Sequence, residues 1–428
     1  MEFSLRSICQ EQSFALAYMF LSSNRFIYIL FGIFFLCIHL IFAQESEDLD
    51  AELDALLKAE GFDIDLNGEL LSEEDLTELL DNDVLGELLK ESNWELDLKL
   101  RAGLGYGDNV LYGAFEEVGS GYFLGAIDGL YYRTKDDPWN AFIYFYGEHL
   151  EYFEDVDPGR LYVTQGQLSR LAKDQKRNFG LSATHLFYDQ VFDASGDLNT
   201  FDTLGVSAHQ IEVEPFVDFY LENEMEFRIE GFVSGSRFED SYDDSDSLGA
   251  LVRLKRPFGE RTTVTAQYFF EDRNFWERVS RDSEGFATDG ETRLQIGIAT
   301  LTLKVDEKEP EGWSFRSELS HYSQRDQEAG YTDFDRIRIS QKASKSWDNW
   351  ELYLSGRYTW FDHLVRVAEF GGTDLLYRRG FEGSLALTRE ISDKTSIFIE
   401  SQYERNSSNS PDNVFSATRV VIGLERAL

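Results

Sequence analysis

The sequence is poor in cysteine, proline and positive charge, and each shortage excludes a class of protein. Its 428 residues include 2 Cys and 6 Pro. So few cysteines exclude a disulfide-framed secreted scaffold and a cysteine-rich zinc module. Lys and Arg number 40 against 79 Asp and Glu, a formal net charge of −39. Because nucleic-acid binding requires a cationic surface, no nucleic-acid partner is expected.

The amino terminus has the form of an export signal. Arg25 precedes the apolar run Phe26–Phe42, which ends at Ala43 before the chain turns acidic. A positive residue, an apolar stretch and a small residue at the cut are typical of a secretory signal peptide, and an uncleaved anchor is the alternative. Residues 1–43 are therefore predicted to be a signal peptide whose true start, Met19, lies downstream of Met1. Both cysteines precede the cut, so the mature chain has none.

An acidic segment follows at residues 44–92. It holds 18 Asp and Glu against two Lys, a net charge of −16, with leucines at helical spacings. We predict short amphipathic helices, or a solvated periplasmic arm that folds on a partner. One stretch within it fits the twelve-residue EF-hand loop, with Gly68 at the turn and possible Ca²⁺ ligands at Asp63, Asp65, Asn67, Glu69 and Glu74. The alternative is a plain acidic arm without a bound cation.

From Trp94 onward the sequence alternates between apolar and polar residues. The stretch from Trp94 to Arg101 places an apolar residue at every second position and a charged one between. This pattern indicates a β-strand with one apolar and one solvent-exposed polar face. Sixteen such runs are predicted, at approximately 94–108, 122–135, 139–153, 161–173, 178–192, 208–222, 225–238, 247–257, 261–275, 290–305, 313–326, 334–346, 350–363, 374–391, 395–406 and 414–428.

The length of the runs and their connections favour a membrane barrel over a soluble β-sandwich. Soluble strands average five or six residues, whereas these runs are about twice as long. Connections after even-numbered runs are mostly short, and those after odd-numbered runs are mostly longer, as in bacterial outer-membrane barrels. We therefore predict an all-β fold: an up-and-down antiparallel transmembrane barrel of about sixteen strands over residues 93–428, located in the outer membrane of a Gram-negative-type bacterium.

Strand parity predicts which side chains face the inside of the barrel. Sixteen strands leave an aqueous channel, whereas eight leave a packed interior. The inward charges would be acidic on the middle strands and basic on the later ones. Either opposite walls carry opposite charge, or the charges pair across neighbouring strands. The predicted pore-lining residues are Glu212, Glu214, Glu226, Arg228, Glu230, Arg253, Arg316, Arg336, Arg338 and Arg357.

Enzyme motifs give no support for catalysis. The sequence contains neither a G-x-S-x-G nucleophile motif nor an H-E-x-x-H zinc motif. His149, His209 and His363 would lie near the loop end, where some outer-membrane enzymes place their catalytic residues. Five scattered histidines in an aromatic-rich barrel are more often wall residues, so we expect no enzyme and no catalytic residues.

The last predicted hairpin resembles the closing hairpin of porin-like outer-membrane barrels. The resemblance rests on Tyr403–Asn409, Phe415 and Arg419–Leu424, within a stretch of about 22 residues. It implies that something passes through or along the barrel, without indicating what, and that the barrel-assembly machinery assembles the protein. That machinery usually reads a terminal aromatic residue, whereas this chain ends in Ala427-Leu428. Porins of this size commonly trimerise, so a homo-oligomer is an open expectation.

Two functions of different classes follow. The first is a channel for passive diffusion of small polar solutes or ions. The second is a non-conducting barrel for export or assembly, in which the acidic arm docks a partner or plugs the lumen. Outer-membrane lipid and lipopolysaccharide are expected partners in both cases. The acidic run Glu239–Asp246 would bridge lipopolysaccharide phosphates through divalent cations, or form a solvated loop tip.

Overall fold

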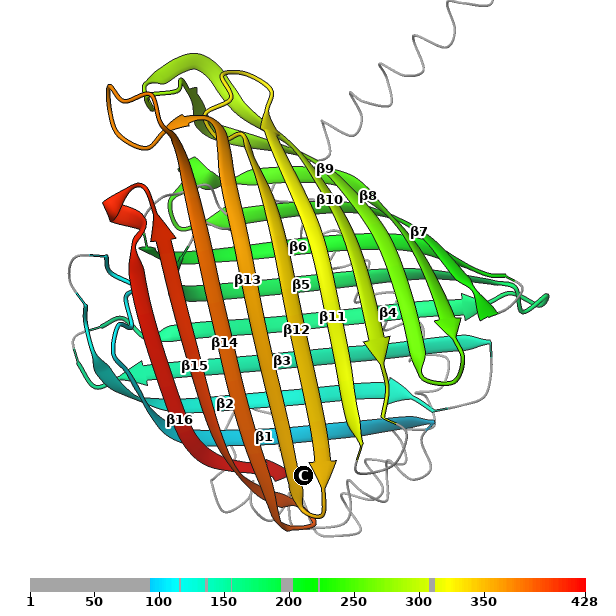
Figure 1. The fold of residues 1–428 in the computed structure, drawn as a ribbon. Helices are drawn as coiled ribbons and strands as arrows, with labels where there is room; N and C mark the ends of the chain where they lie inside the picture. The colour runs from blue at the N-terminus through cyan, green and yellow to red at the C-terminus, as the bar shows by residue number, and fades with distance from the viewer. Residues whose placement is uncertain are drawn as a thin grey trace, which may run out of the picture. The chain divides into compact units, whose positions relative to one another are not determined.

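The chain closes into a barrel of sixteen antiparallel strands in which each strand pairs with its sequence neighbours and β1 pairs with β16 (Figure 1). The computed structural model describes residues 93–428, except 115–116, 135–137, 155, 194–202, 222–223 and 308–311. The strands are β1 Trp94–Gly107, β2 Ser120–Arg133, β3 Trp139–Tyr152, β4 Gly159–Leu171, β5 Arg177–Asp193, β6 Thr203–Tyr220, β7 Glu226–Phe238, β8 Ser245–Phe258, β9 Thr262–Arg281, β10 Ala287–Val305, β11 Trp313–Asp326, β12 Phe334–Trp347, β13 Trp350–Val367, β14 Leu375–Ser392, β15 Thr395–Ser408 and β16 Phe415–Ala427.

The predicted fold class and strand number are confirmed. The run predicted at 313–326 is strand β11, and the other runs overlap their strands to within a few residues at most ends. The clearest differences are at β6, which begins at Thr203 instead of 208, and at β9 and β13, which run on past their predicted ends to Arg281 and Val367. The extensions of β9 and β13 coincide with irregular register in the pairing. Backbone pairing continues there after the alternation of side chains has broken down, which is why the pattern ended the strands too early.

The barrel has two distinct ends. At one end, called here the turn end, the connections follow even-numbered strands, and both the start of β1 and the finish of β16 lie there. The turn between β12 and β13 has two residues, and Asp348 adopts a φ of 45° in it. At the loop end, short 3₁₀ helices η3 (Ser241–Asp243) and η4 (Pro411–Asn413) lie in the connections. The turn end corresponds to the periplasmic side of an outer-membrane barrel.

The sheet has an apolar outer face and a more polar inner face. Leu104 of β1 lies between Ile422 of β16 and Phe123 of β2 in the register. These side chains are 59%, 56% and 43% exposed, although they are large and apolar. Side chains alternate along each strand, so their neighbours in sequence point to the opposite, inner face. The outer face therefore forms a belt of exposed aliphatic and aromatic residues around the barrel.

The inner face also has apolar clusters that fill part of the interior. Near the loop end of β9 to β13, Leu294, Ile296, Tyr322, Phe334 and Phe361 belong to one buried cluster. A second cluster joins β2, β3, β15 and β16 through residues that include Leu124 and Phe398. These clusters narrow the lumen locally. Within the described residues, no helix is long and apolar enough to cross a membrane.

Candidate functional site

The candidate site is the inner face of the barrel, and the register places all ten predicted pore-lining residues on it. Glu212 of β6, for example, lies opposite Thr184 of β5 and Ser234 of β7. Its neighbours Ile211 and Val213 point to the outer face. The same parity holds for Glu214 on β6, Glu226, Arg228 and Glu230 on β7, Arg253 on β8, Arg316 on β11, Arg336 and Arg338 on β12 and Arg357 on β13. Their contact with a passing solute stays a prediction.

Five inward carboxylates lie close together on two neighbouring strands, β6 and β7. We call this the acidic wall, defined by Glu212, Glu214, Asp218, Glu226 and Glu230. Arg228 lies within it: its Nε donates to Asp218 Oδ1 at 2.5 Å and its Nη2 donates to Oδ2 at 2.9 Å. Asn178 donates to the same carboxylate at 3.1 Å, and Glu230 lies 3.5 Å from Arg228 Nη1. Asp218 is 2% exposed, so its carboxylate is shielded from lumen water.

The next strand, β8, supplies cations to the edge of the acidic wall. Arg253 Nη2 donates to Glu226 Oε1 at 3.2 Å, and Lys255 Nζ donates to Glu226 Oε2 at 3.3 Å. Glu212 and Glu214 lie two residues apart on the inner face of β6 and add two further carboxylates. The wall is therefore neutralised on its β8 side and rich in carboxylates on β6.

Arginines dominate the inner face of β12 to β14. We call this the basic wall, defined by Arg336, Arg338, Arg357 and Arg378. Two of its guanidinium groups stack on aromatic rings: Arg336 lies 4.3 Å from the Tyr322 centroid, and Arg378 lies 5.2 Å from that of Phe361. Arg336 and Arg378 are 6% and 3% exposed. Ring stacking stabilises these cations in a crowded wall.

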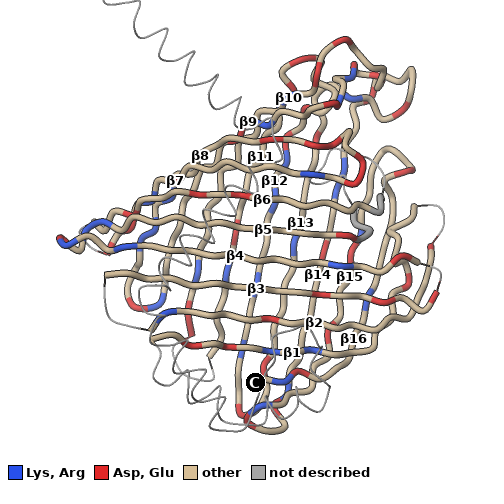
Figure 2. Tube along the Cα trace, turned by 180° about the vertical axis from the view of Figure 1, so that it is seen from behind, with Lys and Arg blue, Asp and Glu red and all other residues tan. Residues whose placement is uncertain are grey.

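Opposite charge across the lumen and pairing between neighbours both occur. In a ring of sixteen strands, β6 lies eight positions from β14 and six from β12, so the two walls lie on opposite sides of the lumen. Charged residues of both signs recur along the strands (Figure 2). Local pairs coexist with this arrangement, since Arg357 Nη1 donates to Glu382 at 2.8 Å and Arg316 Nη2 donates to Glu318 at 3.3 Å. The two alternatives open at the sequence level are thus combined in one lumen.

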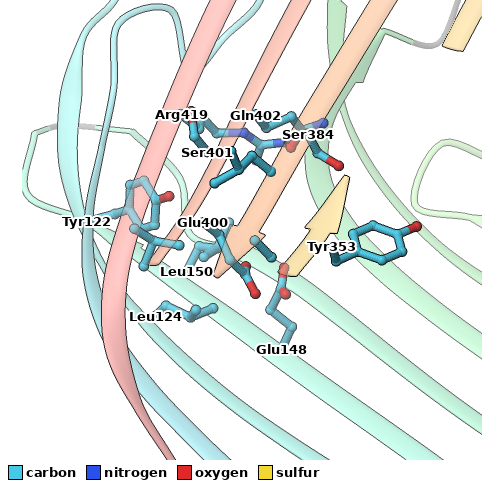
Figure 3. Close-up of a pocket in the computed structure, with 13 residues that line it drawn as sticks. Tyr122, Leu124, Glu148, Leu150, Tyr353, Ser384, Glu400, Ser401, Gln402 and Arg419 are labelled. Atoms are coloured by element: carbon cyan, nitrogen blue, oxygen red, sulfur yellow. Dashed lines mark hydrogen bonds between the residues drawn. The ribbon is translucent and has the colours of Figure 1, made fainter. Parts of the chain in front are cut away.

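A hollow of about 320 Å³ lies in the inner wall formed by β2, β3 and β13 to β16. Figure 3 shows Glu148 and Glu400 at its floor, with Arg419 and Gln402 above them and Tyr353 at its side. Arg419 Nη2 donates to Gln402 Oε1 at 3.0 Å. Hydrogen-bond donors, acceptors and charges of both signs therefore line one recess, which suits a polar solute better than an apolar one.

An apolar belt outside and charged walls inside are the arrangement expected of a barrel that spans a lipid bilayer. A closed barrel has no unpaired strand edge, so all its backbone groups are satisfied within the sheet even in hydrocarbon. Alternating apolar-out and polar-in side chains complete that arrangement. The chain forms a closed β-barrel of outer-membrane architecture. The predicted location in the outer membrane of a Gram-negative-type bacterium follows from this structure.

Comparison with solved structures gives likenesses to outer-membrane proteins. OccAB1 of Acinetobacter baumannii has a TM-score of 0.43 at 8% identity, covering 79% of this chain and 97% of that one. An anion-selective porin from Comamonas acidovorans has a TM-score of 0.43 at 11% identity, covering 79% and 100%. OmpT of Vibrio cholerae has a TM-score of 0.40 at 12% identity, covering 78% and 97%. These scores and identities bear on no solute, partner or activity. No family model matches the sequence, and no curated protein matches it.

At the loop end, the connection between β1 and β2 packs against the inner wall. Tyr112 is 8% exposed and meets Phe415 edge-on, with 5.5 Å between ring centroids. Arg419 lies 5.8 Å from the centre of the Tyr112 ring. Burial raises the pKa of Tyr112 to about 12, so the phenol is neutral at any physiological pH. Asn109 fixes the loop by donating to the carbonyls of Gly113 and Ser416 at 3.0 Å each.

The histidines considered for a rim enzyme do not converge. His363 faces inward against the Phe334 ring, with 5.6 Å between ring centroids. His209 faces outward and lies 3.2 Å from His185, ring nitrogen to ring nitrogen. His149 faces outward and contacts Glu151 at 3.0 Å. In the described part of the chain, no group of three or more His, Cys, Asp or Glu is arranged to hold a metal ion. The predicted signal peptide, acidic arm and Ca²⁺ loop lie outside the described residues.

The inner face also carries a group of tyrosines that the charge pattern did not predict. Tyr122, Tyr144, Tyr146 and Tyr152 all point inward from β2 and β3. Tyr146 donates to Glu148 at 2.6 Å, which orients that carboxylate at the hollow. The parity that identified the charged residues would have found these tyrosines as well.

Proposed function

We propose that this barrel is a channel for passive diffusion of small polar solutes or ions across the outer membrane. The observation that carries the proposal is the inner face, where the acidic and basic walls oppose each other inside a closed sheet. Strands spaced about 4.8 Å apart and tilted by about 40° would give sixteen strands a diameter of roughly 30 Å. Such a barrel is wide enough for an aqueous path even after inward side chains fill part of it.

The deciding measurement is single-channel conductance of the refolded mature chain in planar bilayers. Steady steps from a protein with heat-modifiable gel mobility, which reports a folded barrel, are the expected result. A folded barrel that never conducts would overturn the proposal. Conductance only after removal of residues 45–92 would favour the alternative, in which the acidic segment closes the lumen.

Charge reversal in the basic wall tests whether ions pass the walls described here. The double variant Arg336→Glu and Arg338→Glu should shift the reversal potential in a salt gradient towards cation selectivity, because it replaces two positive groups on the inner face by negative ones. Arg405→Glu is the control, since Arg405 points outward from β15. An equal shift from the control would show that the ions do not pass the basic wall.

A further inference from the structure

The outer face carries a band of basic residues at the turn end. The register places on it seven outward-pointing cations from seven strands: Arg133, Arg170, Arg177, Arg256, Lys345, Arg389 and Arg426. We call this the basic rim. At the turn end of the described outer face the strands present no Asp or Glu; outward carboxylates such as Glu151 and Asp272 lie farther towards the loop end. In a chain of net charge −39, this local excess of positive charge is a distinct surface feature.

Most cations of the basic rim lie over aromatic rings. Four of its cations lie over an outward ring of the same strand or of the strand beside it. The distances to the ring centroids are 5.1 Å for Arg170 over Trp139, 4.9 Å for Arg256 over Phe258, 5.9 Å for Lys345 over Trp313 and 5.1 Å for Arg389 over Trp350. Trp is enriched where headgroups meet hydrocarbon. The rim therefore marks the boundary of the apolar belt, with its cations held at headgroup depth.

A hollow of about 1020 Å³ opens at this boundary, between the turn-end residues of β2 and β3 and the turn joining β4 to β5. Arg133, Arg170 and Lys173 line it together with Trp139 and Phe179. Among the described residues that line the hollow there is no carboxylate. Three cations beside two aromatic rings form a site for a phosphate group attached to an apolar body.

The loop end of the outer face is built differently. There several outward arginines are paired with aspartates of the neighbouring strand. Arg237 donates to Asp246 at 2.8 Å, and Arg379 donates to Asp362 at 2.8 Å. At the turn end, Asp174 binds Arg177 at 2.9 Å from within the turn itself. The charge excess of the basic rim is thus a property of one membrane boundary and not of the whole outer face.

We propose that the basic rim binds anionic phospholipid headgroups of the periplasmic leaflet, with the hollow at Arg133, Arg170 and Lys173 as its principal site. The phosphate would meet the three cations, while the acyl chains would lie along the apolar belt beside Phe179. The distribution over seven strands fits a shell of lipids and exceeds what one peptide segment could cover. The site is independent of whether the lumen conducts.

Native mass spectrometry of the full mature chain in detergent tests this site. The protein is titrated with phosphatidylglycerol and with phosphatidylcholine of the same acyl chains, and their dissociation constants are compared. The wild type should prefer phosphatidylglycerol by roughly fivefold for each cation that contacts the lipid. The triple variant R133Q/R170Q/K173Q should lose most of that preference, whereas R133K/R170K should keep most of it.

The control is R237Q/R325Q/R379Q, which removes the same charge from the outer face at the loop end. Heat-modifiable mobility confirms that each variant is folded. An unchanged preference in R133Q/R170Q/K173Q would overturn the proposal, and so would an equal loss in the control. Displacement of phosphatidylglycerol from the wild type by millimolar inorganic phosphate would show a small-anion site and would also overturn the lipid assignment.

Discussion

At the scale of single residues, the surroundings of an ion pair decide its contribution more than its distance. Arg228 has a side chain that is 16% exposed, and its Asp218 partner is 3% exposed. Arg316 and Glu318 form a pair at 3.3 Å, but their side chains are 53% and 28% exposed. Exposed pairs contribute about 0–1 kcal/mol, whereas removing one partner of a buried pair leaves an uncompensated charge.

We therefore expect Arg228→Gln to lower the free energy of unfolding by about 2–3 kcal/mol, a value reduced because the lumen admits water. Arg316→Gln, the control, should cost less than about 1 kcal/mol. Urea titration of each variant folded into phospholipid vesicles measures the difference. Equal losses from the two substitutions would show that burial does not separate these pairs.

At the scale of elements, closure of the sheet depends on a glycine pair at its seam. Gly103 of β1 lies opposite Gly423 of β16. A Cβ added to Gly423 would stand 2.2 Å from the Ala102 carbonyl oxygen and 2.6 Å from Phe398. The backbone carbonyl of Ala102 cannot shift as a flexible side chain could, so β1 and β16 would have to separate. The absence of a side chain at Gly423 is thus what lets the last strand approach the first.

Gly423→Ala should reduce the yield of folded barrel and lower the free energy of unfolding by about 1–3 kcal/mol. Gly356→Ala is the matched control, because nothing lies within 4 Å of its added Cβ. The fraction of compact, heat-modifiable protein on a gel after refolding measures the effect. Comparable yields from the two variants would contradict the role of the seam.

A repeated arginine arrangement fixes three hairpins at the loop end. In the hairpin of β13 and β14, Arg379 Nη1 donates to the carbonyls of Arg378 and Phe361 at 2.8 Å each, while Nη2 donates to Asp362. Arg237 and Arg325 make the same set of contacts in the hairpins of β7 with β8 and of β11 with β12. A planar fork of donors can satisfy three acceptors at once, which an ammonium on a flexible stem does less well.

Arg379→Lys should therefore speed amide hydrogen exchange at the loop-end residues of β13 and β14 by roughly three- to tenfold, the equivalent of about one hydrogen bond. Arg405→Lys provides the control, since Arg405 lies on the outer face of the adjacent strand β15. Exchange measured by mass spectrometry on the folded barrel gives the rates. Unchanged exchange in Arg379→Lys would show that the charge alone suffices.

Most strands could be read from the sequence, because an outer-membrane strand must alternate over its whole buried length. Parity along β7, for instance, already assigned Glu226, Arg228 and Glu230 to one face. The alternation did not predict strand residues outside the membrane, where nothing requires apolar and polar residues to alternate, as in the extension of β9 to Arg281. The alternation also did not predict which side chains form ion pairs, since the contact of Arg228 with Asp218 depends on the register between two strands.

At the scale of the whole molecule, the opposition of the two walls follows from ring closure. Nothing local in β6 or β14 shows that they face each other, and the sequence left two arrangements open. With sixteen strands in chain order, β6 and β14 must lie half a turn apart. The estimated diameter of roughly 30 Å exceeds the Debye length of about 8–10 Å at physiological ionic strength. The two walls should thus act on permeating ions independently.

If the two walls act independently on permeating ions, their effects on ion selectivity should add. Glu212→Gln with Glu214→Gln should shift the reversal potential towards anion selectivity, because two carboxylates leave the acidic wall. Arg336→Glu with Arg338→Glu should shift it the other way, and the quadruple variant should show the sum of the two shifts, as distant sites generally do. Planar bilayers under a salt gradient measure all three variants. A quadruple variant whose shift departs from that sum by more than the error of measurement would mean that the walls interact across the lumen, through a path much narrower than the backbone diameter of the barrel.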